Sequence, residues 1–183
     1  MRQEKKVLAC VDKSDYATHV ADYAAWAAAR LSAPIELLHV IDRHPEIAAD
    51  VDRSGSIGVD AQENLLERLS QEEGERSKVI REQGRVFLNQ LRARCETHTG
   101  LQTDTRQRYG QLLATLKEQE SSVGMYVLGR RGESVSHTRR DLGRHVEAIC
   151  RQIRRPIMTV TDDFVAPKSV LVAYDGGRMT RRG

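Results

Sequence analysis

The sequence is poor in aromatic residues and in cysteine, and it contains no long apolar run. Aromatic side chains make up 4% of its 183 residues, and its three cysteines, Cys10, Cys95 and Cys150, form no CxxC pair. We therefore expect neither a disulfide framework nor a zinc ribbon, and we interpret the cysteines as reduced thiols of a cytoplasmic protein. No apolar run approaches the roughly 18 residues that a membrane span needs, so the sequence predicts no transmembrane helix.

Several targeting and catalytic motifs are also missing. The first residues are charged and lead into an apolar run that Asp12 interrupts, which is not the pattern of a secretory signal. There is no GxxxxGK(S/T) phosphate loop, no GxGxxG dinucleotide fingerprint after a strand, and no GxSxG elbow around Ser14. Without a recognisable nucleophile or base, the chain is expected not to be an enzyme, and slow ATP hydrolysis is kept as an alternative.

Charged residues are abundant, but their signs nearly balance. The chain carries 29 Lys and Arg against 26 Asp and Glu, for a formal net charge of +3. This is not the strongly basic character of a nucleic-acid-binding protein, and the arginines lack the interleaved aromatic residues that stack on bases. Nucleic acid is therefore not an expected partner.

Five short segments predict strands, and helical segments lie between them. Continuous apolar runs are typical of strands that are buried on both faces, as in a parallel sheet. The sequence thus predicts an α/β fold in which helices cover both faces of a five-stranded parallel sheet. The expected strands span residues 5–12, 35–41, 101–109, 123–128 and 156–161, and the expected helices span 14–31, 59–97, 111–121 and 144–154.

The first two helical segments carry more specific expectations. Ser14 is a suitable N-cap for the first, whose alanine-rich side should pack closely on the sheet. The second follows a polar stretch, residues 42–58, interpreted as a mobile loop, and Gly74 is expected to divide it into two helices. Its second half carries an apolar stripe that is interpreted as core and comprises Ile80, Phe87, Leu88, Leu91 and Cys95.

An internal repeat bears on the domain organisation. Residues 6–14 (KVLACVDKS) resemble residues 169–177 (SVLVAYDGG), because both are apolar runs that end in Asp and a turn. A chance likeness between two parallel-sheet strands is the alternative. We expect one domain over residues 1–163 and, over residues 164–183, a linker and the first strand of an incomplete second domain. That strand, Val170–Tyr174, should be either disordered or paired with another chain, because an exposed apolar edge invites association.

The strongest candidate site combines Asp12 with the glycines that follow the fourth expected strand. In open α/β sheets, ligands bind beyond the carboxyl ends of the strands, where glycines let a backbone approach phosphates. Gly129 and Gly132, with Gly143 just before a helix, fit that mechanism. By itself GxxG is a weak pattern, because a strand-to-helix turn also favours glycine.

Arginines are concentrated around these glycines. They could form an anion-binding face for nucleotide phosphates or an acidic partner, or they could be a solvated surface that Glu133, Asp141 and Glu147 partly neutralise. The arginines concerned are Arg130, Arg131, Arg139, Arg140, Arg144, Arg151, Arg154 and Arg155.

Metal and redox chemistry are not expected. His39 lies in an expected buried strand and His44 precedes a proline, so these histidines near Asp42 are not interpreted as a metal site. Cys10 lies within the first expected strand and should be a buried, unreactive thiol.

These segments together resemble the universal stress protein family, and more narrowly the amino-terminal half of a tandem member. The resemblance implies a Rossmann-like sheet with strand order 3-2-1-4-5, often dimeric through the last strand. Many members bind ATP through G-x-x-G, nine residues, and then Gly followed by Ser or Thr. The resemblance covers nearly the whole span from Lys5 to Asp163 and is carried by VLACVDKS (7–14), LLHVI (37–41), VLGRRG (127–132), LGRHVE (142–147) and RPIMTV (155–160).

The resemblance also implies a role for individual residues. Carried over position by position, Asp12 would lie near the ribose and phosphates, and the backbone of Val40 would meet the adenine. Gly129, Gly132 and Gly143 would cradle the phosphates.

The sequence departs from the family motif in two places. Ten residues, not nine, separate Gly132 from Gly143, and Arg144 replaces the hydroxyl residue. The arginine removes a compact hydroxyl but adds a cation that can bind phosphate bidentately. We expect a cytoplasmic, non-enzymatic stress-response module that binds ATP or AMP, with Arg144 among the contacts. The alternative is a nucleotide-independent interaction module with a vestigial ATP motif. In either case the last strand would pair with a second copy, as a homodimer, or with a second stress-protein domain.

Overall fold

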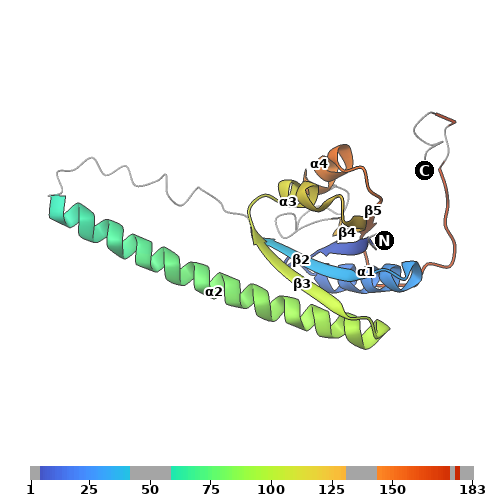
Figure 1. The fold of residues 1–183 in the computed structure, drawn as a ribbon, viewed down its shortest axis with the longest axis horizontal. Helices are drawn as coiled ribbons and strands as arrows, with labels where there is room; N and C mark the ends of the chain where they lie inside the picture. The colour runs from blue at the N-terminus through green and yellow to red at the C-terminus, as the bar shows by residue number, and fades with distance from the viewer. Residues whose placement is uncertain (1–4, 42–58, 131–143, 174–175, 178–183) are drawn as a thin grey trace.

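Five parallel strands and four helices account for the regular structure of the computed structural model, which describes residues 5–41, 59–130, 144–173 and 176–177 (Figure 1). Strands and helices alternate along the chain, as predicted. The elements are β1 (Lys6–Cys10), α1 (Ala17–Leu31), β2 (Ile35–Ile41), α2 (Val59–Thr99), β3 (Thr103–Tyr109), α3 (Leu112–Gln119), β4 (Val123–Gly129), α4 (Arg144–Gln152) and β5 (Ile157–Val160).

The strand order is β3-β2-β1-β4-β5, and every neighbouring pair is parallel. This confirms the predicted fold class and order. β1 lies at the centre, where Cys10 is the register partner of both Leu38 on β2 and Leu128 on β4. The chain order therefore reverses at β1, which is where α/β sheets of this kind bind ligands.

Two hydrophobic clusters, one on each face, hold the sheet between its helices. Successive strand residues point to opposite faces, so Val7 and Ala9 of β1 pack toward α1 and α2, whereas Leu8 packs toward α3 and α4. The small residues of α1 allow the close packing that the sequence predicted, and four of them are fully buried against the sheet, namely Val20, Ala24, Ala25 and Ala28.

The first helix begins later than expected. Tyr16 occupies the N-cap position of α1 and makes no side-chain capping hydrogen bond. The prediction that Ser14 is the N-cap is therefore wrong. Ser14 lies two residues earlier and donates its hydroxyl to Asp12 Oδ1, so the side chain serves the turn after β1 instead of the helix end.

The second helix is one uninterrupted element of 41 residues. The predicted break at Gly74 is wrong, because an exposed glycine costs a helix only about 1 kcal/mol and good helix formers flank it. At Gly84 the helix packs closely on β3, since a Cβ there would lie 2.2 Å from Nε2 of Gln107 and the Gln107 side chain would have to shift. The predicted core stripe is correct for Leu88, Leu91 and Cys95, whereas Ile80 is 41% exposed. The loop expected over 42–58 lies outside the described residues.

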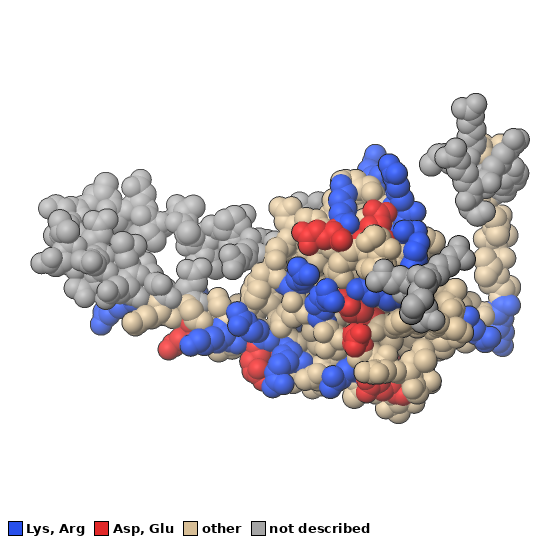
Figure 2. Space-filling model, in the orientation of Figure 1, with Lys and Arg blue, Asp and Glu red and all other residues tan. Residues whose placement is uncertain are grey.

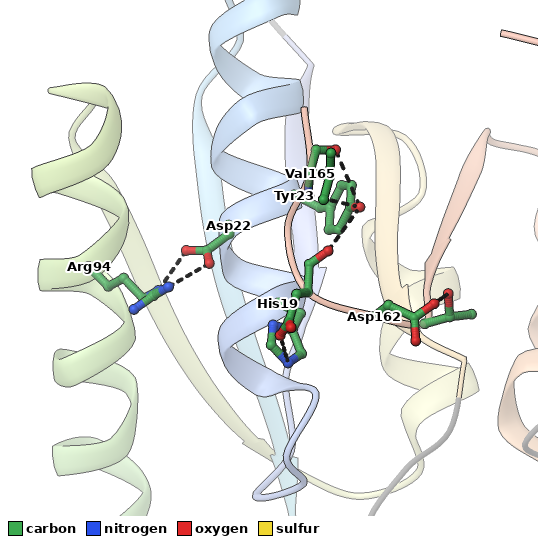
Figure 3. Close-up of polar contacts among 8 residues, drawn as sticks. His19, Asp22, Tyr23, Arg94, Asp162 and Val165 are labelled. Carbon is green, nitrogen blue, oxygen red and sulfur yellow. Dashed lines mark hydrogen bonds and ion pairs between the residues drawn. The ribbon is translucent and has the colours of Figure 1, made fainter. Parts of the chain in front are cut away.

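After β5 the chain crosses α1 and leaves the domain (Figures 1 and 3). The Phe164 ring meets the Tyr23 ring edge to face at a centroid distance of 4.9 Å, and Tyr23 Oη accepts a hydrogen bond from the Val165 amide at 3.3 Å. Beyond this anchor the described residues up to 173 are exposed and form no strand. The boundary at residue 163 and the second-domain interpretation of residues 164–183 stay predictions.

Candidate functional site

The predicted site residues that the structure describes come together at the carboxyl edge of the sheet. Cys10, Leu38 and Leu128 are register partners on three adjacent strands. Asp12 and Val40 each lie two residues beyond these partners, and Gly129 lies one residue beyond. Since neighbouring strands are about 4.8 Å apart, the three positions border one small region above β1.

The structure describes only some of the residues of the predicted glycine motif. Gly132 and Gly143 lie outside the described residues. Arg144 is the first residue of α4, and its side chain is likewise not described. The amino-terminal end of α4 therefore follows the predicted glycine loop directly, and the free N–H groups of a helix start favour an anion there.

Asp12 is held by a turn of its own. Its Oδ1 accepts a hydrogen bond from the Ser14 amide at 3.1 Å and another from the Ser14 hydroxyl. These two donors fix the carboxylate just past the end of β1. A carboxylate in this place can accept hydrogen bonds from sugar hydroxyls, which is the role that the family resemblance implies for Asp12.

His39 positions the end of β1. Its buried ring donates a hydrogen bond from Nδ1 to the Val11 carbonyl at 2.9 Å, and the Val11 amide donates to the Leu38 carbonyl at 2.9 Å. The ring also packs edge to face on Phe87 of α2 at 5.6 Å. His39 thus ties β2 and α2 to the residue that precedes Asp12. Sequence reasoning identified a buried strand histidine but not this positioning role.

Two observations on the described residues concern metal binding and thiol reactivity. Among them, no group of three or more His, Cys, Asp or Glu is arranged to hold a metal ion. Burial, and then the carboxylates of Asp12 and Glu36, raise the pKa of the Cys10 thiol well above its usual value, so the thiol stays protonated and unreactive. Cys10 is half-buried at the last position of β1, closer to the site than a mid-strand position.

The described arginines of the predicted cluster do not form one face. Arg130 lies at the site, where its amide donates to the Val160 carbonyl at 2.8 Å. Arg151 pairs with Glu147 along α4 at 2.8 Å. Arg155 donates from Nε to the Glu120 carbonyl, between α3 and β4, which is the opposite end of the sheet. Basic and acidic side chains are also interspersed on the face that Figure 2 shows.

No helix in the described part of the chain is long and apolar enough to cross a membrane. The longest, α2, carries charged residues throughout its length.

Comparisons with known proteins agree with the fold. The chain is 31% identical over 173 residues to the universal stress protein Slr1230 of Synechocystis sp., covering 94% of this chain and 60% of that relative's length. A universal stress protein family structure from Burkholderia pseudomallei matches with a TM-score of 0.53 at 20% identity, covering 87% of this chain and 98% of that one. A universal stress protein solved in complex with cAMP matches with a TM-score of 0.54 at 16% identity, covering 87% and 98%.

A family model describes most of the chain. The model for the universal stress protein family matches residues 4–161, which include all five strands and the carboxyl edge that holds Asp12, Val40 and Gly129. The chain therefore belongs to the universal stress protein family.

Proposed function

We propose that this protein is a cytoplasmic, non-enzymatic stress-response module that binds an adenine nucleotide at the carboxyl ends of β1, β2 and β4. The observation that carries the proposal is the convergence of Asp12, Val40 and Gly129 at the strand-order reversal, with the Asp12 carboxylate held by Ser14. The Asp12 carboxylate would accept hydrogen bonds from the ribose, and the Val40 backbone would contact the adenine.

The phosphates would lie over the glycine segment and the start of α4. Gly129 ends β4 next to the centre of the sheet, and the loop that contains Gly132 and Gly143 leads to the helix. Arg144 at the first position of α4 would supply a cation for the phosphates in place of the usual hydroxyl. ATP and AMP are the proposed ligands, and the cAMP complex of a family member with the same fold supports an adenine nucleotide.

Calorimetry on the full chain with ATP, AMP and cAMP tests the proposal. We expect binding of at least one nucleotide, and we expect Asp12→Ala to weaken it at least tenfold, which corresponds to about 1.4 kcal/mol. Asp104→Ala is the matched control, since Asp104 is an exposed carboxylate near the start of β3, at the other end of the sheet. Arg144→Ser tests the role of the arginine. If Arg144 binds the phosphates, the variant should have a lower nucleotide affinity. If the usual hydroxyl binds better, the variant should have a higher affinity.

A negative result would have a clear meaning. If no nucleotide produces heat and the purified protein releases none on denaturation, the proposal fails and a nucleotide-independent interaction module replaces it. Equal affinities of the Asp12→Ala and Asp104→Ala variants would instead remove Asp12 from the site.

A further inference from the structure

Both chain neighbours of Asp12 are connected to α2, one directly and one through His39. Lys13 Nζ donates a hydrogen bond to Gln83 Oε1 at 3.1 Å. On the other side of Asp12, the Val11 carbonyl accepts the hydrogen bond from His39, whose ring packs on α2. Since Asp12 lies between these two contacts, the position of α2 bears on the carboxylate that a nucleotide would meet.

The contact through His39 is the stronger of the two. His39 is 7% exposed, and its ring meets the Phe87 ring edge to face at a centroid distance of 5.6 Å. In a close-packed interior a side chain has few alternative positions. The bond between Lys13 and Gln83 joins exposed side chains, so water competes for both groups and the bond contributes little. His39 is therefore the main connection between α2 and the turn that contains Asp12.

The same part of α2 is fixed against the neighbouring strand. Gln107 on β3 is the register partner of His39 on β2. Gly84 packs closely on the Gln107 side chain, and the Tyr109 hydroxyl donates to the Ser77 carbonyl at 3.3 Å. The helix thus bears on two adjacent strands at the same level, so a shift of α2 along the sheet would change the packing of His39.

The Val11 carbonyl connects this packing to Asp12. Val11 is buried, so its carbonyl would lose free energy if the donor from His39 moved away and the chain did not rearrange. The part that would rearrange is the turn after β1, in which the Asp12 carboxylate accepts hydrogen bonds from the Ser14 amide and hydroxyl. The exchange rate of the Ser14 amide therefore reports whether Asp12 is held in place.

We propose that His39 is a positioning residue of the nucleotide site, through which the docking of α2 on the sheet sets the affinity at Asp12. This inference rests on the proposed function, because Asp12 is the residue that would accept hydrogen bonds from the ribose. His39 acts without touching the nucleotide, since its ring is buried between β2 and α2. Coupling of this kind is reciprocal, so a bound nucleotide also strengthens the docking of α2.

Amide exchange in the nucleotide-free protein, measured by NMR, tests the positioning step. His39→Asn keeps a donor close to the place of imidazole Nδ1, whereas His39→Leu has none. We expect the Ser14 amide to exchange at least about tenfold faster in His39→Leu and to stay within about threefold of the original rate in His39→Asn. His98→Leu is the matched control, at an exposed histidine of α2. Equal rates in His39→Leu and His98→Leu would overturn the proposal.

A second pair of variants tests the part played by α2. Phe87→Ala leaves the His39 donor in place but removes the ring on which it packs. The Ser14 amide should then exchange at least about threefold faster. Val86→Ala is the control on the same helix, since Val86 is exposed and does not contact His39. If Phe87→Ala behaves like Val86→Ala, the docking of α2 does not reach Asp12 and the coupling is refuted.

Calorimetry with ATP on the full chain tests the consequence for affinity. We expect His39→Leu to weaken binding at least about tenfold, but less than about twofold further in an Asp12→Ala background, because it acts through that carboxylate. A merely structural role would instead lower affinity equally in both backgrounds, and that result would contradict the proposal. If the original protein binds no nucleotide, the proposed function fails, whereas the exchange of the Ser14 amide still decides whether His39 positions Asp12.

Discussion

A half-buried ion pair joins α1 and α2 on one face of the sheet (Figure 3). Arg94 of α2 donates from Nε to Asp22 Oδ1 at 2.6 Å and from Nη2 to Oδ2 at 2.7 Å. The Asp22 side chain is 6% exposed, whereas the Arg94 side chain is 43% exposed. The hydrogen bond with Asp22 also raises the pKa of Arg94. The pair is therefore asymmetric, because only its acidic member depends on the partner for solvation.

This asymmetry predicts unequal costs for the two single substitutions. Arg94→Ala leaves a carboxylate without its partner in a nearly dry place, and we expect a loss of about 3 kcal/mol in the free energy of unfolding. Asp22→Ala leaves a guanidinium that water can reach, so we expect a loss of about 1 kcal/mol. The double variant should resemble Asp22→Ala, because removing the buried charge also removes the penalty.

Urea unfolding of the four proteins, followed by circular dichroism, measures these differences. Arg92→Ala is the control on the same helix, since Arg92 is exposed and its loss should change the free energy of unfolding by less than about 0.5 kcal/mol. The reasoning is refuted if Asp22→Ala costs as much as Arg94→Ala, or if the double variant costs as much as the two single variants together.

Two further predictions concern the thiols and the tail. Burial raises the pKa of Cys95 from 9.0 to about 12. As the pH rises, the unfolded chain therefore loses the thiol proton before the folded chain does. The free energy of unfolding should fall between pH 9 and 12, by up to about 1.4 kcal/mol per pH unit. Cys95→Ala should make this decline less steep in urea unfolding at pH 8 to about 10.5, the remainder including the contribution of Cys10, and an unchanged slope would contradict the assignment. Tyr23→Ala removes the ring contact with Phe164, which is worth about 1 kcal/mol. Trypsin should then cleave the tail at exposed Lys168 about fivefold faster. Equal cleavage rates of the variant and the original protein would show that the tail is not anchored there.

The sheet was predictable because its signals are local. Leu8, Leu38 and Val127 each lie in a continuous apolar run, whereas a strand exposed on one face would alternate apolar and polar residues. All three residues are fully buried in the structure. β3 was predicted from weaker alternation, and it lies at an edge where alternate residues remain exposed. The proposed position of the site rests on the same signals, since it depends only on where the parallel strands end.

The details around Asp12 could not be predicted in the same way. The hydrogen bond from His39 to the Val11 carbonyl joins residues 28 positions apart, and nothing in either local segment indicates it. Ser14 satisfies the sequence rule for an N-cap, yet its hydroxyl is used by Asp12, two residues earlier. A hydroxyl near a helix start can serve either the helix or the preceding turn, and the backbone path after β1 decides between them.

Ile80 shows why the same pattern can have two meanings within one helix. It continues the stripe of Leu88 and Leu91 with correct helical spacing, so periodicity predicts that all three are core. Periodicity identifies a face, but whether that face is covered depends on how far the sheet extends beneath it, and β3 ends at Tyr109. Ile80 lies within one helical turn of Ser77, whose carbonyl accepts a hydrogen bond from the Tyr109 hydroxyl at 3.3 Å. The side chain therefore packs at the rim of the sheet, where the strand ends and covers it only in part.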